Sequence, residues 1–172
     1  MRTVVTLAAV IVLVGYAAPA QEPVKPGPEV ETLKALVGVW DATIHSKEGD
    51  SKGTMTYKMG LGGLWLFENF QGEFGGMKFE GQGMTSYDPA KKKYVNIWID
   101  SMSATPMISE GSYDKSGRMV MKGQMPSPDG KGMPVTMTSE RKDNDNMVFT
   151  MTAPKDGGTF EMMKITYKRR SK

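Results

Sequence analysis

The chain has 172 residues, no cysteine and a formal net charge of +3, with 22 Lys and Arg against 19 Asp and Glu. This length is typical of one domain and allows a sizeable hydrophobic core without disulfide bonds. The lack of cysteine excludes a thiolate nucleophile and a thiolate metal site. The scattered, nearly balanced charge predicts no nucleic-acid partner.

The first twenty residues have the pattern of a secretory signal peptide. Arg2 precedes an apolar run from Val4 to Val14, and Ala18 and Ala20 then place small residues before a cleavage point. The apolar run is too short for a membrane-spanning helix, which needs about 20 apolar residues. We expect residues 1–20 to be removed after Ala20, giving a secreted or periplasmic protein with no stable membrane insertion.

The next two segments are a linker and a short helix. Residues 21–28 (QEPVKPGP) contain three Pro and one Gly, which favour neither a helix nor a central strand. From Glu29 to Val37, apolar residues fall at helical spacing, and Gly38 is suited to end the helix. The folded domain is expected to extend over residues 29–172.

Beyond this helix the apolar pattern changes to a period of two, which is typical of strands, and Gly, Asp, Asn and Pro separate the segments. The separators include GEFGG, DPAKKK, SATP, DKSG, KDNDN and PKDGG, all suited to tight connections. The predicted strands are Trp40–His45, Thr54–Met59, Gly63–Phe70, Met77–Tyr87, Tyr94–Met102, Met107–Tyr113, Arg118–Gln124, Pro134–Arg141, Met147–Thr152 and Thr159–Lys168.

About ten short strands with tight turns exclude a parallel sheet, because parallel pairing needs long crossovers. The sequence therefore predicts an all-β fold, an antiparallel barrel that resembles a lipocalin and follows a short N-terminal helix. Closure into a barrel is favoured because it removes both exposed sheet edges. A β-sandwich is the alternative.

Several segments resemble a known family. The passage LVGVWD (Leu36 to Asp41) is similar to the Gly-x-Trp start of lipocalins and other calycins, in which the Trp packs at the barrel base. The longer series from Met59 to Ser103, then EGSYDKSGR (Glu110 to Arg118) and ITYKR (Ile165 to Arg169), resembles the bacterial domain of unknown function 1579 family. That resemblance implies a lipocalin-like barrel, often exported, and no established activity.

The only histidine, His45, alternates with Trp40, Ala42 and Ile44 along its strand, so it faces solvent if Trp40 faces the core. No motif surrounds it, and no catalytic triad or haem-binding histidine near the C-terminus is present. We assign no catalytic residue, no metal site and no cofactor.

The 16 methionines are the unusual feature of the composition. Many alternate along strands, such as Met119 with Met121 and Met147 with Met151. Thioethers are ligands for Cu(I) in exported proteins, but metal-binding Met tracts are dense and local, whereas these are spread along the chain. The favoured interpretation is an adaptable apolar cavity or core lined by flexible side chains.

Three strand carboxylates, Glu68, Asp100 and Glu110, share strand faces with apolar or aromatic residues. A carboxylate that points into an apolar barrel is desolvated and can orient a ligand. The alternatives are outward exposure and structural ion pairs.

We expect the barrel to bind a small, mostly apolar ligand, with Trp98 providing a stacking face and Glu68, Asp100 and Ser103 fixing polar atoms. If Val95, Ile97 and Ile99 pointed inward instead, Trp98 would lie on the surface, where a homodimer contact would be available. The competing functions are a ligand-free structural domain with a filled barrel, and an enzyme that uses interior carboxylates as general acid and base.

Overall fold

The computed structural model describes residues 24–47, 49–127 and 129–171. The expected signal peptide (1–20) lies outside the described residues. The first element is helix α1 (Pro28–Leu33), which continues as the 3₁₀ turn η1 (Lys34–Leu36). Pro28 is compatible with the first helical position because the N–H that it lacks has no partner there. The predicted helix is confirmed, although its last turn is the tighter 3₁₀ form.

Ten strands follow, and each overlaps one predicted strand. A second 3₁₀ turn, η2 (Leu61–Gly63), joins the second strand to the third. The strands are β1 (Gly38–His45), β2 (Ser51–Gly60), β3 (Trp65–Phe74), β4 (Met77–Asp88), β5 (Lys93–Asp100), β6 (Ser103–Tyr113), β7 (Met119–Met125), β8 (Met133–Arg141), β9 (Asn146–Lys155) and β10 (Gly158–Arg169).

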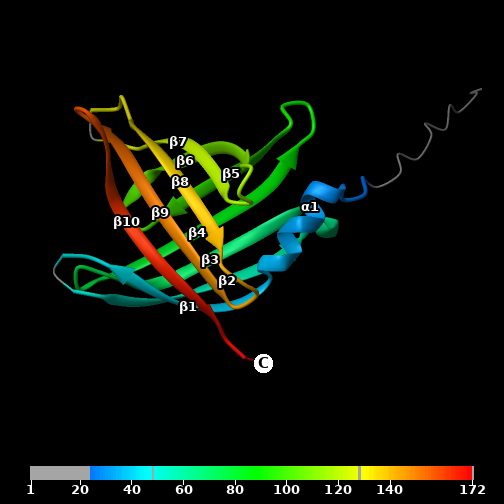
Figure 1. Cartoon of the computed structure of the whole chain (residues 1–172), viewed down its shortest axis with the longest axis horizontal. Coiled ribbons are helices and arrows are strands. Elements are labelled where there is room, and N and C mark those ends of the chain that lie inside the picture. Colours follow the sequence, from blue (N-terminus) through cyan, green and yellow to red (C-terminus); the bar gives the residue numbers. More distant parts are fainter. Residues whose placement is uncertain (1–23, 48, 128, 172) are drawn as a thin grey trace, which may run out of the picture.

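The strands form one closed antiparallel barrel in which each strand pairs with its sequence neighbours and β1 pairs with β10 (Figure 1). The closing register places Trp40 opposite Arg169 and Ile44 opposite Ile165. This ladder leaves no open sheet edge. The predicted barrel is confirmed, and the β-sandwich alternative is wrong.

Several predicted turns are shorter than expected because the strands run further into them, and GEFGG and SATP are examples. In GEFGG, β3 continues to Phe74, which pairs with Met77 across a turn of Gly75 and Gly76, both at positive φ. In SATP, β6 already begins at Ser103, which pairs with Asp100.

Alternation along the strands sends one set of side chains into the barrel. On β1, Trp40, Ala42 and Ile44 are buried, and Trp40 has no exposed surface. Helix α1 lies at one end of the barrel, where Leu33 is buried and the Tyr94 hydroxyl donates to the Glu29 carbonyl at 3.0 Å. The helix therefore covers part of that end.

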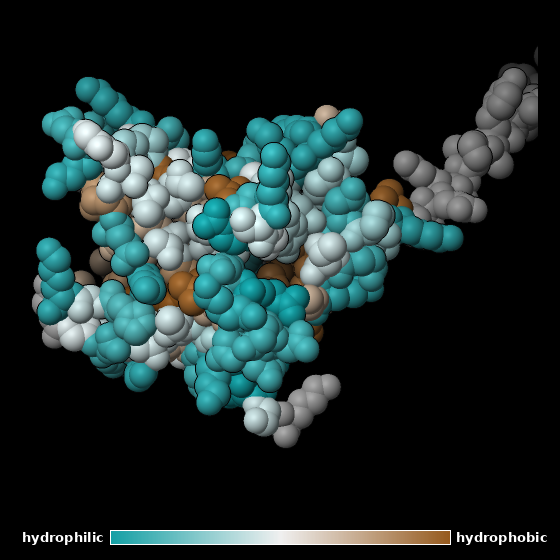
Figure 2. All heavy atoms as spheres, in the orientation of Figure 1, coloured by the Kyte–Doolittle hydropathy of each residue, from teal (hydrophilic) through white to brown (hydrophobic). Residues whose placement is uncertain are grey.

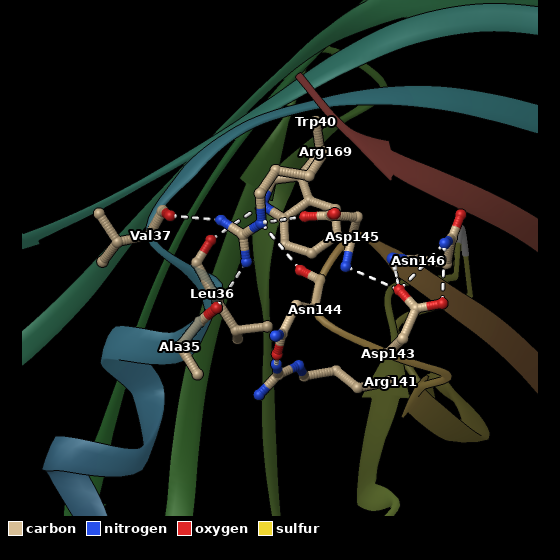
Figure 3. A network of polar contacts seen from close by, with 10 residues as sticks. All are labelled: Ala35, Leu36, Val37, Trp40, Arg141, Asp143, Asn144, Asp145, Asn146 and Arg169. Carbon is tan, nitrogen blue, oxygen red and sulfur yellow. Dashed lines mark hydrogen bonds and ion pairs between the residues drawn. The ribbon is translucent and has the colours of Figure 1, made fainter. Parts of the chain in front are cut away.

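The same end is fixed by Arg169 (Figure 3). Its guanidinium lies over the Trp40 ring, 4.0 Å from the centroid, and donates to the carbonyl oxygens of Val37 at 2.6 Å and Ala35 at 2.7 Å. A third hydrogen bond reaches the Asn144 carbonyl at 2.9 Å. One side chain thus connects the last strand, the segment that follows α1 and the β8–β9 turn.

Candidate functional site

The barrel encloses a cavity of about 520 Å³. Its lining extends from Leu33 and Leu36 near α1 to Phe74 and Phe79 near the β3–β4 turn. In the space-filling view, apolar atoms are visible in recesses between hydrophilic surface residues (Figure 2). The cavity is therefore an apolar space inside a polar shell.

Eight methionines line this cavity, and four of them form a continuous row. Met121 of β7 faces Met137 of β8, which faces Met151 of β9, which faces Met163 of β10. We call these four residues the methionine row. Its unbranched thioether side chains form one wall that can change shape around different contents. The other four are Met55, Met107, Met119 and Met147.

A polar cluster lies on the strands that face this cavity from β3 to β5. The Glu68 carboxylate Oε1 accepts hydrogen bonds from the Thr85 hydroxyl at 2.6 Å and from the Asn96 amide nitrogen at 3.0 Å. Asn96 also donates to Thr85 at 2.9 Å. Burial raises the pKa of the Glu68 carboxyl, and the two hydrogen bonds oppose that rise only in part. Glu68 thus favours its protonated form more than an exposed glutamate does.

Further hydroxyl groups line the cavity around this cluster. Tyr57 of β2 lies directly opposite Glu68, and Tyr167 of β10 lines the same space. Burial raises the pKa of both phenols, so both stay protonated as hydrogen-bond donors. Ser109 of β6 lies opposite Asn96 and is 2% exposed. Polar groups with hydrogen-bonding capacity therefore converge on one part of a mostly apolar cavity.

Trp98 points into the barrel and lines the cavity. Its indole lies over two glycines of β4: a Cβ on Gly81 would be 2.2 Å from the indole, and one on Gly83 would be 2.9 Å from it. The indole nitrogen donates to the Asp100 carboxylate at 3.0 Å, which holds the ring in place. The hydrogen at these two glycine positions is what allows the large ring to pack flat against the wall.

The chain matches one protein family over most of its length. A family model described as "Protein of unknown function (DUF1579)" matches residues 25–169. The chain belongs to this family. No curated protein sequence matches it.

The DUF1579 barrel is also similar to solved structures. An S-type phycobiliprotein lyase from Guillardia theta has a TM-score of 0.58 at 9% identity, covering 83% of this chain and 92% of the lyase chain. A redesigned β-barrel bound to DFHBI has a TM-score of 0.42 at 14% identity, covering 78% and 99% of the two chains. At 9% identity, the similarity to the lyase shows a shared fold and nothing more.

The DUF1579 barrel brings together two of the four predicted ligand-binding residues. Glu68 and Trp98 both line the cavity, and both approach Gly83, which lies between them in the register. Ile99 is 51% exposed and Trp98 lines the cavity, so the alternative in which the other face of β5 points inward is wrong.

The other two predicted residues are not part of the cavity lining. The Asp100 carboxylate is occupied by the Trp98 indole and by the Met102 backbone N–H at 2.8 Å. Ser103 begins β6, and its hydroxyl is hydrogen-bonded to Thr105. Asp100 therefore positions Trp98, whereas Ser103 stabilises the local backbone.

Two other candidates lie on the outer face of the barrel. Glu110 forms ion pairs with Lys91 and with Lys93, the latter at 3.8 Å. The His45 side chain is 37% exposed and has Asp50 at 3.0 Å and Thr166 at 3.1 Å as partners. Sequence reasoning missed Thr85 and Ser109, whose role depends on the cross-strand register.

Within residues 24–47, 49–127 and 129–171, no helix is long and apolar enough to cross a membrane. The described residues also contain no cluster of three or more His, Cys, Asp or Glu side chains suited to a metal ion.

Proposed function

We propose that this DUF1579 barrel binds a small, mostly apolar molecule in its interior. The observation that carries the proposal is the cavity of about 520 Å³, lined by eight methionines, with hydrogen-bonding groups at one place on its wall. Ligand sites are typically apolar cavities of about 300–1,000 Å³ with a few convergent polar groups. The cavity matches both parts of that description.

The lining also supports a particular kind of recognition. Thioether side chains adapt their rotamers to a ligand's shape, which favours modest selectivity over one tightly matched ligand. Trp98 adds a rigid aromatic face beside the adaptable methionine row. A ligand with an extended apolar body and one polar end would contact both parts of the lining.

The cavity and its lining fit the competing functions less well. A filled structural barrel would leave little space, because barrel interiors without ligands are packed by side chains. An acid–base enzyme of the expected kind needs two interior carboxylates, and Glu68 is the one carboxylate in the described cavity lining.

Export remains part of the proposal. The signal-peptide pattern of residues 1–20 leads us to propose a secreted or periplasmic location. Intact mass of the protein recovered from the exported fraction should correspond to a chain that starts at Gln21. A chain that keeps its N-terminus in the membrane fraction would contradict export as a soluble protein.

The binding proposal is tested with the fluorescent apolar probe N-phenylnaphthylamine. We expect a saturable increase in probe emission at one probe per chain. Met137→Trp, which enlarges a side chain in the methionine row, should weaken binding. The matched control is Thr138→Trp, one residue along the same strand but on the outer face, which should leave binding unchanged. No saturable binding, or equal binding by both variants, would contradict the proposal.

A further inference from the structure

The Ser109 hydroxyl has no hydrogen-bond partner among the described residues. Ser109 is 2% exposed and lines the cavity. A buried hydroxyl that makes no hydrogen bond costs free energy, and native proteins leave few such groups. Its presence on a cavity wall indicates that the missing partner belongs to the contents of the cavity.

The neighbours of Ser109 do not satisfy it. Across β5 it faces Asn96, whose amide nitrogen donates to Glu68 and Thr85 instead. Across β7 it faces Gly123, which has no side chain. Within the described residues, no hydrogen bond involves the Asn96 side-chain oxygen Oδ1 or the Glu68 Oε2 atom. The wall therefore offers a hydroxyl, an amide oxygen and a carboxyl oxygen to a ligand.

The charged side chains around the cavity limit the charge that a ligand can carry. Arg141 is the one cationic side chain in the described lining. It lies at the end of β8, is exposed and donates to Asn144 at 3.1 Å in the β8–β9 turn. An anionic group beside Glu68 would thus be buried without a cationic partner, which is costly. A cationic group would require burying an ion pair, whose desolvation offsets the attraction.

We propose that the ligand carries an uncharged head group with both a hydrogen-bond donor and an acceptor, such as a primary alcohol or amide, and that this head group binds at Ser109, Asn96 and Glu68. The apolar body of the ligand then extends along the methionine row. This inference rests on the proposed function.

The test measures displacement of N-phenylnaphthylamine by three ligands with the same apolar chain: decanol, decyl methyl ether and decanoate. The ether keeps the acceptor and lacks the donor, and decanoate is anionic. We expect decanol to bind about tenfold more tightly than the ether, the value of one hydrogen bond of about 1.4 kcal/mol. Decanoate should bind more weakly than decanol.

Two variants then locate the head group. Ser109→Ala should weaken the binding of decanol and of the ether alike, because the oxygen of each ligand accepts from the Ser109 hydroxyl, and should leave probe binding unchanged. Its melting temperature without ligand should equal or exceed that of the wild type, because the variant deletes an unsatisfied hydroxyl. The control is Ser112→Ala, on the same strand but on the outer face, which should bind both ligands as tightly as the wild type does.

The outcomes separate this inference from the proposed function. If the probe does not bind, the proposed function fails. If the probe binds but decanol and the ether compete equally, or if Ser109→Ala binds both ligands as tightly as the wild type does, the inference fails and the proposed function stands. If decanoate binds most tightly and Arg141→Gln abolishes that binding, the head group is anionic and binds at the barrel rim, which overturns the inference.

Discussion

Arg169→Ala is expected to be among the most destabilising single changes at a polar residue of this barrel. The Arg169 side chain is 22% exposed, and its three hydrogen bonds to backbone carbonyls lie near the surface. The substitution leaves the carbonyls of Val37, Ala35 and Asn144 without their donor. It also removes the cation over the Trp40 ring.

The magnitude follows from these contacts. A hydrogen bond contributes about 1 kcal/mol net, and more when the donor is charged. A partly buried cation–π contact adds about 1 kcal/mol. The ion pair with Asp145, which is 67% exposed, adds little. Because water can reach the carbonyls that lose their donor, we expect a loss of about 2–4 kcal/mol in the free energy of unfolding, a large share of the about 5–15 kcal/mol typical of a domain.

Urea unfolding followed by tryptophan fluorescence measures this loss. The matched control is Arg170→Ala, the next residue, which is 50% exposed and pairs with the exposed Asp41. We expect that variant to unfold close to the wild type. Arg169→Lys should be intermediate, because lysine keeps the charge but its single nitrogen cannot reach carbonyls that are bound by three different guanidinium nitrogens. Equal, small losses for Arg169→Ala and Arg170→Ala would refute the reasoning.

Three further predictions concern the cavity and the outer face. In fluorotryptophan-labelled protein, Gly81→Ala should shift the Trp98 NMR signal far more than the other two tryptophan signals, because the new Cβ would lie 2.2 Å from the Trp98 ring; an unmoved Trp98 signal would place that ring elsewhere. Burial raises the pKa of Glu68 above its usual 4.5, so the stability that its protonated form contributes is present below the unfolded pKa and is lost as pH rises through the folded pKa. In urea unfolding at several pH values, Glu68→Gln should therefore gain stability relative to the wild type as pH rises over that interval. A difference in unfolding free energy that stays constant with pH would contradict the burial of Glu68. His45→Ala should cost about 0.5 kcal/mol and leave probe binding unchanged, since His45 lies on the outer face; a large loss of probe binding would show that the outer face contributes to the site.

The barrel could be predicted well from the sequence because its turns contain residues with distinct backbone preferences. Pairs such as Gly75-Gly76 at positive φ mark the hairpins, and alternation of apolar residues marks the strands between them. The strand ends were less accurate, because β3 and β6 continue into residues that also suit turns. Continued pairing with a neighbouring strand decides those ends, and pairing is not visible in one segment.

The candidate site was only partly predictable for the same reason. Both faces of β5 carry large apolar or aromatic side chains, so alternation alone could not decide whether Trp98 or Ile97 points inward. The small residues Gly81 and Gly83 decide it, because they leave room for the indole only on the inner face of β4. The polar cluster depends on which residues of β3 to β6 lie opposite one another, and that register was not part of the prediction.

The central claim, that the cavity holds a small apolar ligand, is tested most directly by native mass spectrometry of the protein purified from the organism that produces it. The account predicts a discrete mass increase from a bound small organic molecule on the wild type. The Met137→Trp variant, isolated in the same way, should carry less of it, and Thr138→Trp should carry as much as the wild type. A wild-type protein that shows only the mass of the bare chain, or an adduct retained equally by Met137→Trp, would contradict the claim.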